Sequence, residues 1–165
     1  MIEKIKILLL LRHAKSSWKN KELDDHDRPL NKRGKMEAIK MGEYLKKTNL
    51  IPDVIVTSSA LRALDTTTLV CRHSDYKKLV EVNFTLHKGG IDSYIKAIAE
   101  TPQDKDVLML VGHNPVLEEL VTMLTNSSIN ISTCTMVQIN LYVTNWKNIV
   151  SQYIFRSEIV KIWKP

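Results

Sequence analysis

Apolar residues along this chain form short, dense runs that are separated by longer amphipathic stretches. The first run, residues 5–11, is much shorter than the roughly 20 residues that cross a bilayer. Such a run is typical of a strand buried on both faces at the centre of a parallel sheet. The runs at 54–57 and 106–111 predict two more buried strands, and residues 77–84 predict a further strand.

Helical periodicity fills the spaces between these runs. We expect helices over 32–47, 60–70, 91–99 and 115–124. Asn31 is a good N-cap for the first helix, and Ser58 and Ser59 are expected to cap the second. Asn114 followed by Pro115 is a strong start signal for the last helix.

The residues after this helix change in character. The segments 135–143 and 149–154 alternate and are rich in β-branched and aromatic side chains. They predict a hairpin or edge strands with a turn near Asn145. Because strands alternate with helices, we expect residues 1–165 to form a single three-layer α/β/α domain. Its central sheet should be mostly parallel, with the C-terminal strands at an edge.

The composition, with 44% hydrophobic and 25% charged residues among 165, fits a globular protein. The formal net charge of +6 suits acidic or phosphorylated partners. The lysines are scattered and form no basic stripe, so we expect no nucleic-acid partner. Cys71 and Cys134 lack the spacing of a disulfide framework or a zinc site. No signal sequence is visible, and we expect a cytoplasmic protein with two free thiols and no membrane partner.

Polar and basic residues follow three of the predicted strands directly. Arg12 and His13 end the first strand, Ser58 ends the second with Arg62 shortly after it, and His113 follows the strand at 106–111. The carboxyl ends of parallel strands meet at one edge of a sheet, where ligands bind in open α/β folds. We therefore expect these five side chains to form one positive pocket that suits a phosphoryl group.

The sequence excludes several kinds of phosphate chemistry at that edge. No glycine-rich loop of the dinucleotide or nucleotide-triphosphate type follows the first strand. No carboxylate cluster with metal spacing and no cysteine in a phosphate loop is present there. A histidine remains as the nucleophile. Neighbouring arginines would keep the imidazole of His13 neutral and able to attack phosphorus. We expect no metal and no cofactor.

Four motifs in this chain resemble those of the histidine phosphatase superfamily, which has the phosphoglycerate-mutase-like fold. They are Arg12-His13-Ala14-Lys15-Ser16, Asp27-Arg28-Pro29-Leu30 with Arg33-Gly34, Ser58-Ser59-Ala60-Leu61-Arg62-Ala63 with Thr66, and Gly112-His113-Asn114. The short length looks like the small branch of SixA-type phosphohistidine phosphatases. The resemblance covers essentially the whole chain.

The resemblance implies a role for each of the central residues. His13 is the nucleophile that becomes phosphorylated, and Arg12, Arg62 and His113 bind the phosphoryl oxygens and stabilise the transferring group. Water then hydrolyses the phosphohistidine intermediate, and no metal is required. Ala14 departs from the glycine that is common at its position in the wider family.

Other residues are candidates for contact with the substrate. Lys15 and Ser16 are either rim residues or phosphate contacts, and Ser58 is a further candidate. Arg28 either lines the pocket or holds its loop through a neighbouring aspartate. Trp18 is expected to pack the first loop against the body of the protein, with contact to substrate as the alternative.

The sequence offers no clear general acid. Larger family members carry a carboxylate after a middle strand, but here Glu81 comes too early and His87 is not a carboxylate. The loop carboxylates Asp24, Asp25 and Asp27 are other candidates, each expected to be solvated. His26, His73 and His87 are expected at the surface. Because an alkoxide needs a proton to leave and a phosphorylated imidazole can already carry one, the gap favours N–P substrates.

These features together predict a metal-independent phosphatase that works through a phosphohistidine enzyme intermediate. The preferred substrate is phosphohistidine on a signalling or phosphotransfer protein, and we expect the enzyme to be a monomer. A small phosphate ester such as a sugar phosphate is the alternative substrate. A phosphate-binding module without turnover is a second alternative, against which the full set of basic residues argues.

Overall fold

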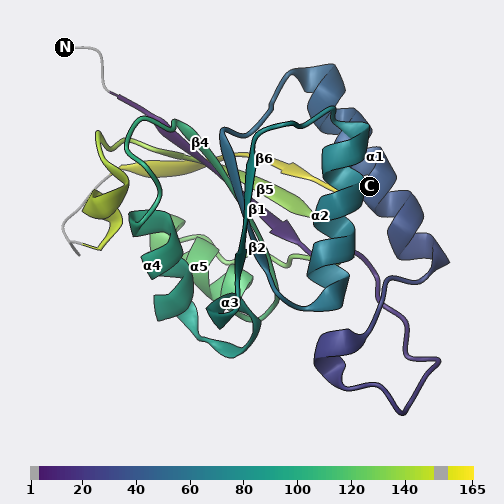
Figure 1. The fold of residues 1–165 in the computed structure, drawn as a ribbon. Helices are drawn as coiled ribbons and strands as arrows, with labels where there is room; N and C mark the ends of the chain where they lie inside the picture. Colours follow the sequence, from purple (N-terminus) through teal and green to yellow (C-terminus); the bar gives the residue numbers. More distant parts are fainter. Residues whose placement is uncertain (1–3, 151–155) are drawn as a thin grey trace.

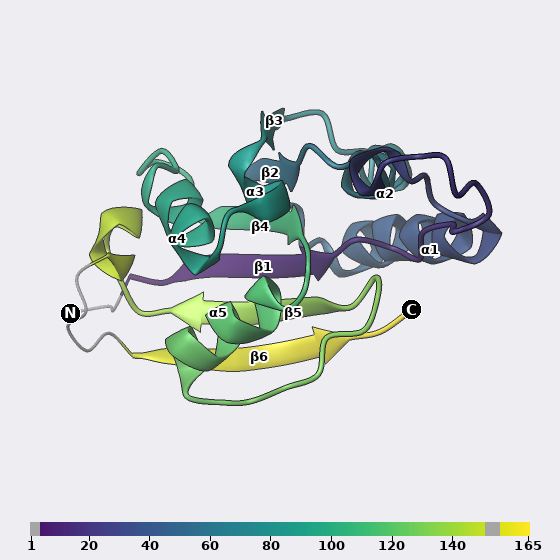
Figure 2. The ribbon, with the colours of Figure 1, turned by 90° about the horizontal axis from the view of Figure 1, so that it is seen from below.

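The computed structural model describes residues 4–150 and 156–165, in which six strands form one sheet of order β3-β2-β4-β1-β5-β6 (Figure 2). The strands are β1 (Lys6–Arg12), β2 (Val54–Ser58), β3 (Leu79–Asn83), β4 (Val107–Gly112), β5 (Met136–Leu141) and β6 (Ser157–Trp163). The helices are α1 (Lys32–Thr48), α2 (Leu61–His73), α3 (Thr85–Lys88), α4 (Ile91–Ala99) and α5 (Val116–Thr125). Two 3-10 turns are η1 (Asp25–Asp27) and η2 (Trp146–Ile149).

The direction of the strands decides where the candidate residues meet. Strand β4 runs parallel to β1 and β2, and β3 runs parallel to β2, whereas β5 is antiparallel to both β1 and β6. The expected α/β fold with a mostly parallel sheet is therefore confirmed. Because β1, β2 and β4 are mutually parallel neighbours, their carboxyl ends lie together at one edge.

Helices cover both faces of the sheet. In Figure 1 α1 and α2 lie on one side of the strands, and α3, α4 and α5 lie on the other. Leu8 and Leu10 of β1 face the core that includes α4 and α5, while Leu9 and Leu11 face the core that includes α1. All four are fully buried. The unbroken apolar run thus arises because both faces of β1 are covered.

The C-terminal prediction was partly wrong. Residues 146–149, which include the start of the expected strand at 149–154, form η2, and residues 151–155 lie outside the described part of the chain. The second edge strand is β6, later than expected. Trp146 fixes η2 in place, because its fully buried indole donates a hydrogen bond of 2.8 Å to the carbonyl of Lys105.

The cap of α1 is confirmed, and it also fixes the loop after β1. The side chain of Asn31 accepts a hydrogen bond of 2.8 Å from the backbone N–H of Gly34. Gly34 packs closely on the backbone of Lys15. A Cβ atom on residue 34 would lie 2.1 Å from the carbonyl oxygen of Lys15. The N–H of Asn31 donates to the same carbonyl at 3.0 Å. The start of α1 therefore holds the segment that follows His13.

The expected serine cap of α2 was wrong. Ala60 occupies the N-cap position, and no side chain caps the helix. The hydroxyl of Ser58 lies 2.7 Å from the ring of His113, and that of Ser59 lies 3.0 Å from the ring of His26. Both hydroxyls thus contact histidines at the sheet edge instead of capping the helix.

No helix in the described part of the chain has the length and apolar character that a membrane span requires.

Candidate active site

The residues that end the three strands come together as the sequence predicts. The Nε of Arg62 lies 3.3 Å from Nε2 of His13, and the ring centroids of His13 and His113 are 5.1 Å apart. Arg12 ends β1, and Ser58 ends β2. His13, Arg62 and His113 are each less than a tenth exposed. Their proximity follows from the parallel order of β2, β4 and β1.

His13 has one ring nitrogen engaged and one available. Its Nδ1 lies 2.8 Å from the carbonyl oxygen of Ala14, which can only accept, so Nδ1 carries the proton. The other nitrogen, Nε2, therefore has a free lone pair, toward which Arg62 directs its Nε–H. Burial, together with the charges of Arg62, Arg12 and Arg28, lowers the pKa of His13 to about 4. The imidazole is neutral near pH 7 and chemically able to act as a nucleophile.

His113 is held from two sides. Its Nε2 lies 2.7 Å from the hydroxyl of Ser58, and its backbone N–H donates to the hydroxyl of Tyr94 at 3.1 Å. Burial, and then the charges of His13 and Arg62, lower the pKa of His113 to about 3. Neither His113 nor Ser58 is among the residues that line the pocket. His113 lies beside the ring of His13, and the fully buried Ser58 reaches the site through its contact with His113.

Arg12 is fixed by the loop that precedes β5. Its Nη1 donates a 2.9 Å hydrogen bond to the carbonyl of Ile131, while its buried Nε has no partner among the described residues. Asn114 donates to the same carbonyl and to Glu118, which in turn accepts from the N–H of Ile131. The N-cap expected at Asn114 was therefore wrong, because its amide connects this loop to α5 instead.

Asp25 joins two arginines beside the pocket. Its carboxylate accepts from Nη2 of Arg62 at 3.1 Å and from Nη1 of Arg28 at 2.8 Å. Its backbone carbonyl accepts from Nη1 of Arg62 at 2.7 Å. Burial acts to raise the pKa of Asp25, but the two guanidinium groups outweigh it and lower the pKa below its usual range. This carboxylate is therefore ionised near neutral pH and positions the arginines.

A pocket of about 180 Å³ opens at these groups. It is lined by Arg12, His13, Lys15, Ser16, Trp18, Arg28, Arg62 and Thr133. Lys15 is exposed at its rim, whereas Ser16 is buried and accepts a hydrogen bond from Arg28. The guanidinium of Arg28 lies 3.3 Å from the ring centroid of Trp18. Trp18 is 68% exposed, so the expectation that it packs against the body of the protein was wrong.

Sequence reasoning missed three residues of this region. His87 was expected at the surface, but its side chain is only 10% exposed and its ring centroid lies 5.6 Å from that of His113. Asp25 was expected as a solvated loop carboxylate, a candidate acid or a partner of Arg28; its contact with Arg28 is present, but its contact with Arg62 was not predicted, and Thr133 was not predicted as a pocket residue. His87 closely follows β3, whose carboxyl end lies at the same edge of the sheet. This position in the sequence could have indicated that His87 lies near the site. The loop that carries Thr133 has no comparable pattern.

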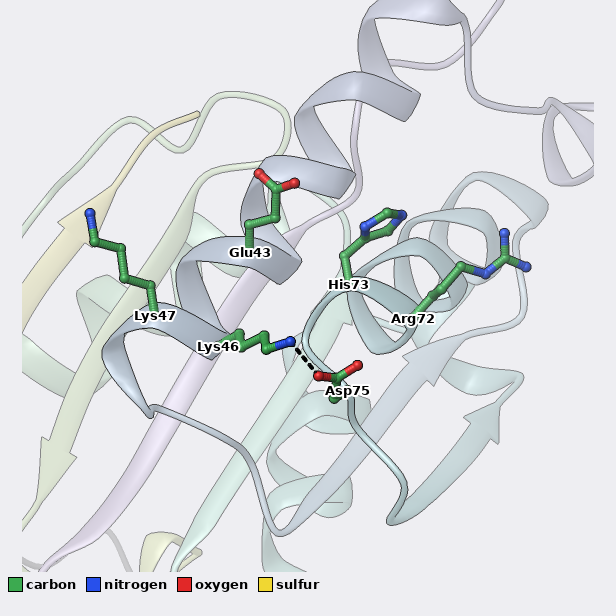
Figure 3. A pocket seen from close by; sticks show the side chains of 6 residues that line it. All are labelled: Glu43, Lys46, Lys47, Arg72, His73 and Asp75. Carbon is green, nitrogen blue, oxygen red and sulfur yellow. Dashed lines mark ion pairs between the residues drawn. The ribbon is translucent and has the colours of Figure 1, made fainter.

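A larger hollow of about 480 Å³ lies elsewhere, between the C-terminal ends of α1 and α2 (Figure 3). Lys46 and Asp75 form an ion pair across it. Its lining residues are Glu43, Lys46, Lys47, Arg72, His73 and Asp75, all exposed except His73. These side chains form a solvated surface, without the buried arginines and histidines of the strand ends. In the described part of the chain no group of three or more histidine, cysteine or carboxylate side chains gathers to hold a metal.

The chain is similar in sequence to proteins of several organisms. The profile of the histidine phosphatase superfamily (branch 1) matches residues 8–89. An uncharacterised chloroplast protein of Arabidopsis thaliana is 32% identical over 149 residues, which cover 85% of this chain and 68% of the relative. A 2,3-bisphosphoglycerate-dependent phosphoglycerate mutase of Streptomyces avermitilis is 43% identical over 70 residues, or 41% of this chain and 28% of the mutase.

Solved structures share the fold over nearly the whole chain. A protein of Agrobacterium tumefaciens assigned as the phosphohistidine phosphatase SixA superposes with a TM-score of 0.83 at 23% identity and covers 97% of this chain and 98% of its own. A SixA structure with tungstate gives a TM-score of 0.79 at 18% identity, with 96% of each chain covered. The chain belongs to the histidine phosphatase superfamily, which confirms at the level of the family the expectation of a histidine-nucleophile phosphatase with the phosphoglycerate-mutase-like fold.

Proposed function

We propose that this protein removes the phosphoryl group from phosphohistidine on a partner protein, through a phosphorylated His13. The small size of the pocket is the observation that favours a protein substrate over a sugar phosphate. Small-molecule sites commonly measure about 300–1,000 Å³, whereas this pocket measures about 180 Å³. A pocket of this size suits the phosphoryl group as the part of the substrate that is held most closely. The remainder of the substrate would stay outside, as a side chain presented on a protein surface would.

The first step is attack by His13 on the phosphorus atom. Nε2 forms the new bond while the bond from phosphorus to the leaving nitrogen breaks and its electron pair goes to that nitrogen. Arg62 lies 3.3 Å from Nε2 and can transfer its hydrogen bond to a phosphoryl oxygen as the bond forms. Arg12 has an unused buried Nε for the same purpose. Fixed positive groups of this kind stabilise the charge of the transferring group.

The second step returns the enzyme to its starting state. A water oxygen attacks phosphorus, the bond to Nε2 of His13 breaks, and the electron pair goes back to the ring. The hydrogen bond from Nδ1 to the carbonyl of Ala14 stabilises the positive imidazolium of the intermediate and keeps its orientation. His113 remains beside the ring of His13 in both steps, held by Ser58.

The other candidate residues take supporting roles in this proposal. Lys15 at the rim and Ser16 inside the pocket are placed to meet phosphoryl oxygens or the partner surface. Arg28 both lines the pocket and holds Asp25. Ser58 acts through His113. We further propose that residues 1–165 act as one monomeric catalytic domain in the cytoplasm, for which the two free thiols of Cys71 and Cys134 are suited.

Transient labelling tests the covalent step. Brief incubation with a ³²P-labelled phosphodonor should leave an acid-labile, base-stable phosphate on the native protein and none on His13→Ala. His73→Ala, in the distant hollow of Figure 3, is the matched control and should label fully. Native protein that turns over substrate without carrying label would exclude the covalent mechanism.

A comparison of rates tests the substrate class. We expect kcat/KM on a phosphohistidine-bearing protein to exceed kcat/KM on a panel of sugar phosphates, because the small pocket holds mainly the phosphoryl group and a protein can add contacts at the rim. A preference for the sugars by orders of magnitude would contradict the proposal. Binding of phosphate without turnover of either class would instead identify a binding module.

A further inference from the structure

His87 is a titratable side chain that the two steps above leave unused. It belongs to the short helix α3, which follows β3 at the edge where the pocket opens. Its side chain is nine-tenths buried, yet neither Nδ1 nor Nε2 has a hydrogen-bond partner among the described residues. Buried polar atoms without partners are rare and costly in folded proteins. An imidazole with both nitrogens unpaired is therefore well placed to bind a group that arrives with the substrate.

The surroundings of His87 place it next to the phosphoryl-binding residues. Its ring centroid lies 5.6 Å from that of His113 and 4.9 Å from that of His26, in edge-on contacts. Its Nε2 lies 3.9 Å from the carboxylate of Asp25. Asp25 is a poor proton donor, because Arg62 and Arg28 hold it in its ionised form. His113 also has an unpartnered Nδ1, but its Nε2 is engaged by Ser58, whereas both ring nitrogens of His87 are without a partner among the described residues.

We propose that His87 donates the proton to the leaving group; this inference rests on the function proposed above. As Nε2 of His13 bonds to phosphorus, the leaving atom takes the electron pair of its broken bond and the proton of His87. In the second step neutral His87 accepts a proton from the attacking water. The oxygen of that water bonds to phosphorus, and the electron pair of the P–N bond returns to His13. The protons balance over one turnover.

Substrate binding allows His87 to take up a proton from solvent. In the empty site burial, and then the charges of Arg62 and His26, lower the pKa of His87. A bound phosphoryl dianion places negative charge among these cations and raises the pKa of each nearby imidazole. The charged and titratable groups that face His87 are Arg62 from α2, Asp25 and His26 from η1, His113 after β4, and Lys88 on its own helix.

A proton donor at His87 widens the range of leaving groups that the enzyme is expected to accept. The apparent lack of an acid favoured leaving groups that already carry a proton. With His87 in the site, leaving groups of higher basicity become substrates whose rates depend on that proton. The dependence on the leaving group is therefore the signature of the proposed role.

Two aryl phosphates of similar size test this signature. Phenolate is about as basic as the tyrosine side chain, with a pKa of about 10, whereas p-nitrophenolate is much less basic and leaves without an acid. For His87→Asn we expect kcat/KM on phenyl phosphate to fall about 100-fold, in the range of general-acid effects, with little change on p-nitrophenyl phosphate. The alkaline decline of kcat on phenyl phosphate should disappear in the same variant.

His26→Asn is the matched control, because His26 contacts the same ring but has both its nitrogens near partners, Ser59 and Asp27. It should keep the native ratio of the two rates. Equal losses on both substrates in His87→Asn, or no loss on either, would overturn the donor role. Labelling of His13 from p-nitrophenyl phosphate separates the proposals: native enzyme that hydrolyses this substrate without carrying label overturns the proposed function, whereas a labelled native enzyme with equal losses overturns the donor alone.

Discussion

At His13 one short contact decides which nitrogen can react. The carbonyl of Ala14 takes the Nδ1 proton, and this leaves the Nε2 lone pair facing Arg62. Burial and the neighbouring arginines then keep the ring neutral. A nucleophile of this kind needs no base to remove a proton before it attacks.

The titration of His13 provides a direct test of this environment. The pKa of His13 is lowered to about 4, so its neutral form should persist well below the ordinary value of about 6.5. We expect the ring C–H signals of His13 to titrate near pH 4 in NMR spectra, with assignment from a His13→Gln variant. A midpoint of His13 near 6.5 would contradict the prediction.

Residues that directly follow a buried strand could be predicted from the sequence. Arg12, His13 and His113 fall in this class, because parallel strands bring their carboxyl ends together. Asp25 and His87 were harder to predict: Asp25 lies in a loop and contacts Arg62, 37 residues later, while His87 lies in a short helix and only its position after β3 indicated the site. Contacts between residues far apart in the chain are not visible in a local sequence pattern.

At the scale of elements, α4 positions the end of β4. Tyr94 of α4 donates a hydrogen bond to the carbonyl of Leu86 at 3.0 Å and accepts one from the N–H of His113. A Cβ at Gly112 would lie 2.2 Å from the Tyr94 hydroxyl. The glycine therefore allows the tyrosine to approach the backbone that presents His113.

Gly112→Ala should separate β4 from Tyr94. We expect kcat/KM to fall on the order of 100-fold, because small displacements of site residues have effects of that size. Overpacking should also lower the free energy of unfolding by about 1–3 kcal/mol. Steady-state kinetics and thermal unfolding measure the two effects. Gly90→Ala is the control, because a Cβ there meets nothing within 4 Å; equal behaviour of the two variants would disprove the steric argument.

The elements themselves differ in how well the sequence predicted them. The central strands and α1 were predicted closely, because dense apolar runs and a capping asparagine act locally. The caps of α2 and α5 were not, because Ser58, Ser59 and Asn114 have stronger partners in distant segments. The last strand was misplaced because the anchoring of η2 by Trp146 depends on the loop that holds Lys105.

At the scale of the whole molecule, the buried histidines make stability depend on pH. The folded-state pKa values of His13 and His113 are lowered to about 4 and about 3, whereas the unfolded chain binds these protons near 6.5. Between these limits the unfolded state binds more protons, so the free energy of unfolding rises with pH. The stability of the free enzyme is therefore greatest above about pH 6.5 and declines as the solution is acidified toward pH 3.

We expect the midpoint of thermal unfolding to fall steadily between pH 7 and pH 4, with a loss of stability on the order of a few kcal/mol. Asp25 adds to the decline only below about pH 4, because its pKa is lowered by Arg62 and Arg28 against the effect of burial. A His13→Gln/His113→Gln double variant should show a shallower slope when unfolding is followed by circular dichroism. An unchanged slope would show that other groups carry the effect.

The sequence by itself determined the α/β fold class, the buried strands and the set of basic residues at their ends, because dense apolar runs and helical periodicity are local patterns. Only the tertiary structure decided which nitrogen of His13 is free, which carboxylate holds the arginines, and that His87 lies in the site. Those features depend on distances of a few ångströms between segments far apart in the chain. They arise when the loop after β1 and the helix after β3 pack against the same edge of the sheet.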